Sequence, residues 1–220
     1  MALAQLGAGW APYVERVLTE LAGDASPPGG FVSLACRLLD LTVGWNEKMD
    51  LTAAKSAEEL VDLTLADAAA LFGHAELAPG AAWLDVGSGA GAPGVPLALF
   101  EPGLRLTLVE PLQKRVAFLR TLVGTLGISA QIVRGRSETL APCSTEHAIS
   151  RATLAPPAWL AEGARLATRE VWLLLAREEP PSLAGWAVRT DFACEWPLTG
   201  RKRRLVAFRP LGPRDEPTVK

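Results

Sequence analysis

Apolar side chains in the first third of the chain recur with helical spacing. Between residues 13 and 21 they follow an i, i+3, i+4 pattern, which predicts an amphipathic helix. The same spacing predicts a second helix over residues 34–45, after a Pro- and Gly-rich linker. Ser56 and Glu59 match a capping box that opens a third helix, which runs to about residue 71. We therefore expect residues 1–79 to form a helical N-terminal part.

The pattern changes at about residue 82, where short apolar segments begin to alternate with amphipathic ones. Strands are predicted over residues 83–87, 105–110, 130–134, 147–151 and 171–176, with helices over 93–100, 112–126 and 157–167. This alternation predicts a mostly parallel sheet covered by helices on both faces. A tail over residues 191–208, turning at Thr199-Gly200, predicts an antiparallel hairpin. The expected fold is thus an α/β, Rossmann-like domain over residues 80–220 with an N-terminal helical extension.

Composition excludes several classes of protein. The 220 residues are 49% hydrophobic and 21% charged, enough to bury a core, yet they contain no uninterrupted apolar run of membrane-spanning length. The three cysteines lack CxxC spacing, and no secretory signal is visible, so we expect a cytoplasmic protein without disulfides or a metal site. Net charge is −2, divided into −7 over residues 1–80 and +5 over residues 81–220. A locally basic face remains open, against ordinary scatter of surface charge.

A glycine-rich segment carries the strongest chemical signal. Leu84-Asp85-Val86 leads into Gly87, Gly89 and Gly91, which let the backbone turn between a strand and a helix and let a ligand approach closely. Glu110 ends the next strand, 21 residues after Gly89, where an acid hydrogen-bonds ribose hydroxyls. The pair predicts a nucleotide-type ligand.

Asp85 helps to choose that ligand. Residues 89–94 match GxGxxG, so a nicotinamide or flavin dinucleotide has to be considered. A carboxylate just before the glycines would repel an anionic pyrophosphate, whereas the amino and sulfonium groups of S-adenosylmethionine are cationic. Asp85 therefore favours the methyl donor.

Five elements in order then resemble the RsmG (GidB) family. They are Trp45-Asn46 with Leu51-Thr52, LDVGSGAGAPGVPLA, VEPLQKRVAFLR, GRSE, and Ile149-Ser150-Arg151-Ala152. The resemblance covers roughly residues 35–210. It implies a class I methyltransferase fold and transfer of a methyl group from S-adenosylmethionine to N7 of a guanine in 16S rRNA. The partner would be 16S rRNA or the small ribosomal subunit, and we expect a monomer that requires neither a metal nor a membrane.

The resemblance also implies roles for individual residues. Arg151 would face both the donor and the target base as the main catalytic candidate, and Asn46 is a weaker one. Ser137 and Glu138 would flank the adenine. The full set expected to bind the donor is Asp85, Gly87, Gly89, Gly91, Ala92, Glu110, Ser137, Glu138 and Arg151.

The expected RNA contacts rest on basic side chains in the second part of the chain. Lys114 and Arg115 lie on the predicted helix 112–126, and Arg203 and Arg204 lie in the run RKRR. Alternative interpretations are a solvated helix face for the first pair and protection of an edge strand for the second.

Departures from the family pattern concern the presumed RNA side. Where the family has a Lys-His pair, this chain has Leu63 and Thr64, while Asp67 is retained. The family's Lys after the fifth strand is replaced by Ala176 or Arg177, depending on the alignment. The Asn of the family's Asn-Leu-Thr element is Asp50 here. Two alternatives therefore stay open: a methyltransferase of this fold acting on another RNA site or a small molecule, and a non-catalytic binding module.

Overall fold

One seven-stranded sheet organises the molecule. The computed structural model describes residues 3–212, and its strand order is β3-β2-β1-β4-β5-β7-β6. The first five strands are parallel, and β7 is antiparallel to both of its neighbours. The strands are β1 (Ala82–Val86), β2 (Arg105–Glu110), β3 (Ala130–Arg134), β4 (Thr145–Ser150), β5 (Ala167–Leu175), β6 (Trp186–Glu195) and β7 (Lys202–Pro210).

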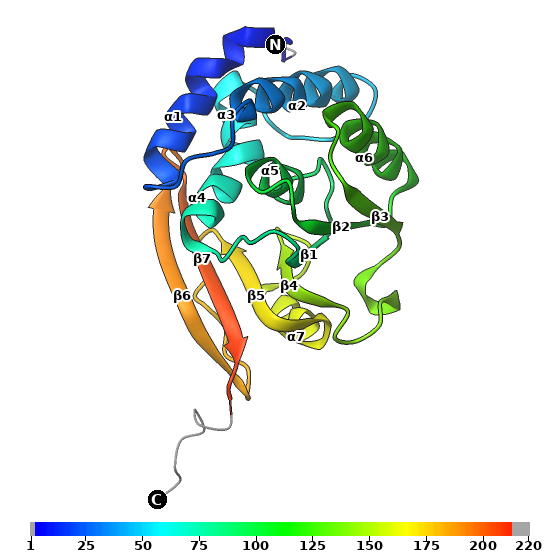
Figure 1. Ribbon diagram of the computed structural model, residues 1–220, viewed down its shortest axis with the longest axis vertical. Helices are drawn as coiled ribbons and strands as arrows, with labels where there is room; N and C mark the ends of the chain where they lie inside the picture. Colours follow the sequence, from blue (N-terminus) through cyan, green and yellow to red (C-terminus); the bar gives the residue numbers. More distant parts are fainter. Residues whose placement is uncertain (1–2, 213–220) are drawn as a thin grey trace, which may run out of the picture.

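Helices cover both faces of this sheet unequally (Figure 1). One face carries η1 (Gly7–Trp10), α1 (Ala11–Leu21), α2 (Phe31–Asn46), α3 (Ala57–Val61), the π-helical η2 (Asp62–Ala66), α4 (Asp67–His74), α5 (Gly94–Phe100) and α6 (Gln113–Leu126). The other face carries α7 (Pro156–Leu166), and the short η3 (Ser137–Thr139) follows β3. Among the described residues, no helix is both long and apolar enough to cross a bilayer.

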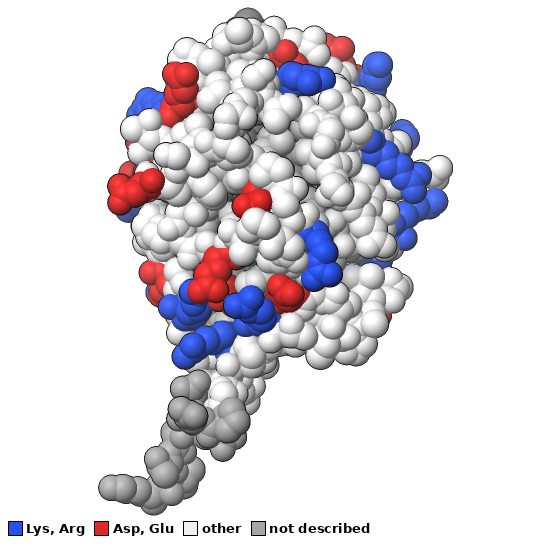
Figure 2. All heavy atoms as spheres, viewed as in Figure 1, with Lys and Arg blue, Asp and Glu red and all other residues white. Residues whose placement is uncertain are grey.

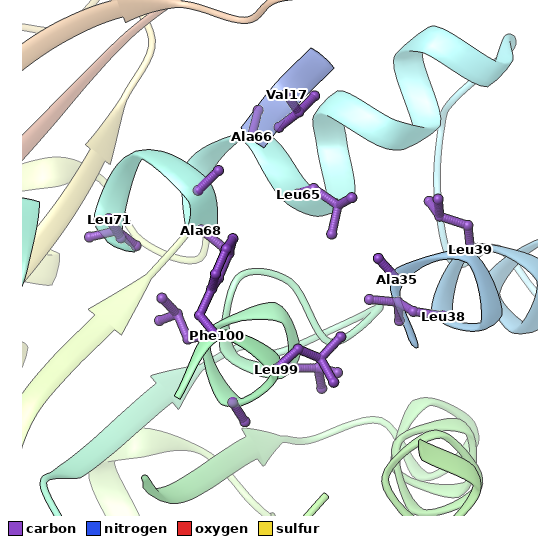
Figure 3. Packing of buried hydrophobic residues seen from close by; sticks show 14 of the residues in the cluster. Val17, Ala35, Leu38, Leu39, Leu65, Ala66, Ala68, Leu71, Leu99 and Phe100 are labelled. Carbon is purple, nitrogen blue, oxygen red and sulfur yellow. The ribbon is translucent and has the colours of Figure 1, made fainter. Parts of the chain in front are cut away.

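The N-terminal helices share one hydrophobic core with the helices of the sheet. Figure 3 shows side chains from α1, α2, η2, α4 and α5 pointing into a common space, with Phe100 directed toward α4. Phe100 stacks on Phe31 and on Phe72 at centroid distances of 4.2 and 4.5 Å. The N-terminal helices therefore hold the surface above the glycine-rich loop in place. A division of the chain at residue 80 remains a prediction.

Most predicted elements are confirmed to within a few residues. The hairpin begins earlier than expected, at Trp186, and β4 and β5 begin before their predicted starts. The predicted third helix is interrupted by the π-helical turn. The helix expected from Pro93 begins at Gly94 instead, because Pro93 takes the N-cap position.

Topology determines where a ligand can bind. The chain leaves β1 toward β2 and β3 on one side, and then returns to add β4 and β5 on the other. Open α/β sheets bind ligands outside the carboxyl ends of the strands at such a point of reversal. Val86 is paired with Ser150, so Gly87 and Arg151 leave the sheet side by side.

Candidate functional site: the carboxyl edge of the sheet

The glycine-rich loop turns tightly at the end of β1. The amides of Gly87 and Ser88 both donate to the carbonyl oxygen of Val109, at 2.8 and 3.1 Å. Gly87 has a φ of +73°, and a Cβ there would collide with Thr153. Gly87 is thus required both for its backbone conformation and for the close approach of the β4–α7 loop, residues 151–155.

Asp85 faces inward from this loop. Its Oδ2 accepts a hydrogen bond from the amide of Gly94, 3.0 Å away, and the residue is only 1% exposed. Burial raises the pKa of its carboxyl to about 7, although the bond from Gly94 and the charge of Arg151 oppose the shift. The sequence interpretation placed this carboxylate beside a cationic ligand; in the structure it binds the first turn of α5, because the loop folds over it.

Glu110 also binds the loop. Its Oε2 accepts from the amide of Gly89 and its Oε1 from the amide of Leu112, both at 2.9 Å. The side chain is buried, and Glu110 lines none of the cavities described below. Its expected contact with a ribose therefore remains a prediction, whereas its support of the loop is observed.

A first cavity of about 220 Å³ lies beside Gly87. Val86, Val109 and Pro111 give it an apolar lining, and Ser137 and Glu138 also line it. Their expected contact with an adenine remains a prediction. A mostly apolar cavity with a few polar groups is typical of a small-molecule site.

A second cavity of about 210 Å³ lies on the other side of the loop. Gly87, Gly89 and Ala92 form its floor, and Thr52, Thr64 and Arg151 form its opposite walls. Gly87 lines both cavities, so the two adjoin at the glycine-rich loop, and we refer to them together as the cleft. Gly91, expected to touch the donor, lines neither of them; a Cβ at this position would collide with the side chain of Val95.

Arg151 links the cleft to the N-terminal helices. Its Nη1 donates to the carbonyl oxygen of Leu63 at 2.6 Å and to Oδ2 of Asp67 at 3.2 Å. The other oxygen of Asp67 accepts from the indole nitrogen of the buried Trp196 at 2.9 Å. Two acceptors one helical turn apart thus bind the same nitrogen of the guanidinium, and about a quarter of the side chain stays exposed.

A third cavity, of about 150 Å³, opens at the carboxyl ends of β4 and β5. It shares Arg151 with the second cavity and Leu154 with the first. Glu178 and Arg203 add charged groups to its wall. All three cavities therefore meet around the β4–α7 loop.

The basic pair Arg203 and Arg204 separates in space, because neighbouring residues of a strand point to opposite faces. The guanidinium of Arg203 lies 3.9 Å from the ring centroid of Trp196, beside the third cavity. Arg204 instead makes a two-bonded ion pair with Asp191 and a further bond to Glu179, and it lines no part of the cavity. An RNA contact by Arg203 remains a prediction, whereas the ion pairs of Arg204 leave little of its charge for the RNA contact expected there.

Lys114 and Arg115 lie at the start of α6, beside the loop that follows α2. With Asn46, Lys48 and Leu112 they line an open groove, and Nη2 of Arg115 donates to the carbonyl oxygen of Asp50. Figure 2 shows Lys and Arg side chains along the edge where α6 and β3 lie, while both signs mix over the β6–β7 hairpin.

Asn46 lies away from the three cavities. Its Oδ1 accepts from the amides of Leu51 and Thr52, at 2.9 and 3.0 Å. Both of these residues line the second cavity. The weaker catalytic candidate therefore acts in this structure as a support for the wall of the cleft, since its carboxamide oxygen is already bonded to backbone.

Three contributors to the site were missed in the sequence. They are Thr153, which packs on Gly87, Trp196, which binds Asp67, and Glu178. Only the retention of Asp67 pointed toward this network. Among residues 3–212, no three His, Cys, Asp or Glu side chains are grouped so as to hold a metal ion.

The fold and this cleft define the class of Rossmann-like, class I methyltransferases. Solved structures of low sequence identity share the fold. TrmN from Thermus thermophilus matches with a TM-score of 0.50 at 22% identity, over 66% of this chain and 48% of that one. A structure titled for the conversion of a disulfide bond into a thioacetal group during echinomycin biosynthesis matches with a TM-score of 0.52 at 16% identity, over 66% and 81%.

The family is more specific than the class. The family model "GidB: rRNA small subunit methyltransferase G" matches residues 32–175, and the chain belongs to this family. The relative from Xanthomonas axonopodis pv. citri, named ribosomal RNA small subunit methyltransferase G, is 33% identical over 90% of this chain and 96% of its own length. For similarly named relatives from Symbiobacterium thermophilum and Chromobacterium violaceum, the match spans only 52% and 60% of their length.

Proposed function

We propose that this protein transfers a methyl group from S-adenosylmethionine to N7 of a guanine in 16S rRNA of the small ribosomal subunit. One observation carries the proposal beyond family membership: the cleft over the glycine-rich loop and the third cavity meet at Arg151. A methyl transfer needs two adjoining sites with a shared boundary, because donor and acceptor must be aligned for direct displacement.

The residues of the cleft fit the donor. The apolar slot beside Val86 and Val109 suits an adenine, with Ser137 and Glu138 placed to hydrogen-bond its edge. The wall formed by Thr52, Thr64 and Arg151 suits a polar amino-acid end. When bound, S-adenosylmethionine would supply an electrophilic methyl group.

Methylation of this acceptor requires little acid–base catalysis from the protein. N7 of guanine carries a free lone pair and no proton, so no general base is needed. The contribution of the chain is alignment, which in favourable cases is worth up to about 7–11 kcal/mol. Arg151 is the candidate donor to O6 of the base, since two partners already hold its guanidinium in place.

The RNA would approach over the groove beside α6. Lys114, Arg115 and Lys48 provide charge for phosphates there. An unstacked base from a single-stranded loop is the natural acceptor, because N7 inside a stacked, folded RNA cannot reach a buried cleft. The proposal includes a monomeric enzyme that acts in the cytoplasm.

The test uses small subunits from cells that lack the gene for this protein. After incubation with the purified protein and S-adenosylmethionine, borohydride reduction and aniline cleavage locate N7-methylguanine in the 16S rRNA. We expect one new cleavage site that is absent when the protein is omitted. Transfer of a labelled methyl group from S-adenosylmethionine to the RNA without such a cleavage site would contradict transfer to N7.

A second candidate function rests on Leu63 and Thr64. Both line the second cavity, and neither carries the charge of the Lys-His pair that they replace. A methyltransferase acting on a different acceptor is therefore the alternative. Donor binding by calorimetry, combined with no methylation of subunits, would favour it.

A further inference from the structure

The third cavity is lined by the carboxylate of Glu178, an exposed residue whose side chain is oriented by its own loop. Oε2 of Glu178 accepts hydrogen bonds from the amides of Ala176 and Arg177, each at 3.0 Å, just past the end of β5. Such bonds turn a flexible side chain into a defined acceptor. A carboxylate offers about four lone-pair positions, so further acceptor capacity is left for a ligand.

This carboxylate is ionised at neutral pH. Hydrogen bonds from its own backbone amide and from those of Ala176 and Arg177 lower its pKa, and the charge of Arg203 adds to the effect. Arg203 lies on the ring of Trp196 and faces the same cavity. The cavity therefore combines a fixed anion with a fixed cation.

The cavity suits a single unstacked base. Its volume of about 150 Å³ has apolar surface from Leu154, Pro156 and Leu174. An enclosed cavity of roughly that volume holds one benzene ring, and this one is open, so a larger ring can protrude. It adjoins the first cavity at Leu154 and the second at Arg151, which is where an acceptor has to lie beside the donor.

We propose that Glu178 selects guanine in this cavity by accepting hydrogen bonds from N1–H and the N2 amino group of the base. This rests on the proposed function and adds the residue that determines its specificity. Guanine presents two adjacent donors on this edge, whereas adenine presents an unprotonated N1 there. O6 lies next to N1–H and N7 lies beyond it, so neither atom is bound by Glu178 and both are left toward Arg151 and the donor.

The experiment compares two acceptors that differ only in the N2 amino group. Small subunits are reconstituted with 16S rRNA that carries guanosine or inosine at the methylated position. For the unmodified protein we expect kcat/KM to be about tenfold or more higher on guanosine, because inosine keeps N1–H but loses the hydrogen bond from the N2 amino group to a charged acceptor. Equal rates on the two acceptors would overturn the proposal without requiring any variant.

Glu178→Gln tests the residue itself. The amide oxygen of Gln can still accept from Ala176 and Arg177, but its amino group would face the donors of guanine. We expect the preference for guanosine over inosine to fall to about one, with the affinity for S-adenosylhomocysteine unchanged. If Glu178 only stabilises the turn after β5, Glu178→Gln will keep the preference for guanosine. That result would overturn the proposal.

Glu179→Gln is the matched control. Glu179 is the neighbouring glutamate, is bonded to Arg204 and does not line the cavity, so the guanosine preference should stay as in the unmodified protein. A total absence of methylation by the unmodified protein would instead contradict the proposed function. The two failures are therefore distinguishable.

Discussion

The carboxylate of Glu110, at the end of β2, accepts a hydrogen bond from the amide of Gly89 in the loop that follows β1, with 2.9 Å between Oε2 and the nitrogen. Its other oxygen accepts from Leu112, at the entry to α6. One buried acid thereby connects the glycine-rich loop to the next strand and the next helix. Glu110, whose spacing of 21 residues from Gly89 predicted a ribose contact, therefore also shapes the loop.

Replacing Glu110 should separate these roles. Glu110→Ala removes charge-assisted bonds to two amides and any contact with the ribose, so the affinity for S-adenosylmethionine should fall by about tenfold to a hundredfold. Glu110→Gln keeps an acceptor for Gly89 and should lose less. Isothermal titration calorimetry measures both, and an unchanged dissociation constant for the Ala variant would contradict a role in the donor site.

Asp85 should make the stability of the protein depend on pH. Burial raises the pKa of its carboxyl from 3.8 to about 7. Between those pH values the unfolded chain releases this proton while the folded chain retains it, so the free energy of unfolding falls as pH rises. The full loss is about 4 kcal/mol, from about 1.4 kcal/mol for each pKa unit.

Asp85→Asn removes this cost, because Asn cannot ionise and still accepts from Gly94. The difference in Tm between Asp85→Asn and the unmodified protein should therefore increase from pH 4 to pH 8. The increase should be about 2–4 °C for each kcal/mol of stability that the unmodified protein loses. Thermal melting followed by circular dichroism checks this. The exposed Asp24→Asn should show no such trend, and a pH-independent difference for Asp85→Asn would refute the assignment.

The sequence predicted the positions of the strands and the parallel character of the sheet well, because each apolar run is short and bounded by Gly, Pro or charge. Position along the chain also placed Gly87, Ser137 and Arg151 at one edge of a parallel sheet. The sequence did not determine the direction in which a side chain points. Asp85 was expected to face a ligand, yet it faces α5, since the loop folds back over it.

Long-range partners were the other limit. Trp196 lies 129 positions beyond Asp67 and still donates to its carboxylate. No local spacing connects such residues, because the contact depends on how the β6–β7 hairpin packs against the N-terminal helices. Arg203 and Arg204 show the same limit: strand alternation predicts opposite faces, but not that Asp191 and Glu179 bind the second of them.

Arg151 should matter for the chemical step more than for binding. Arg151→Ala removes the group at the boundary of the two sites, and loss of one such positioned donor lowers kcat by roughly a hundredfold. Asp67→Asn, which weakens only the support of that guanidinium, should lower it by about tenfold. Single-turnover methylation gives the rates, and filter binding of subunits gives the affinities. A loss of affinity equal to the loss of rate would place Arg151 in RNA binding instead.

Basic residues of α6 should determine how RNA affinity depends on salt. Lys114 and Arg115 line an open groove, so replacing both with Ala should weaken RNA binding and reduce the slope of log K against log salt by about 0.7 for each phosphate that is no longer neutralised. Arg204→Ala is the control, because its charge is already balanced by Asp191 and Glu179 and little RNA affinity should depend on it. Donor affinity should stay constant in both variants, because none of the three side chains lines the cleft. A larger effect at Arg204 than at the α6 pair would move the RNA path from α6 to the β6–β7 hairpin.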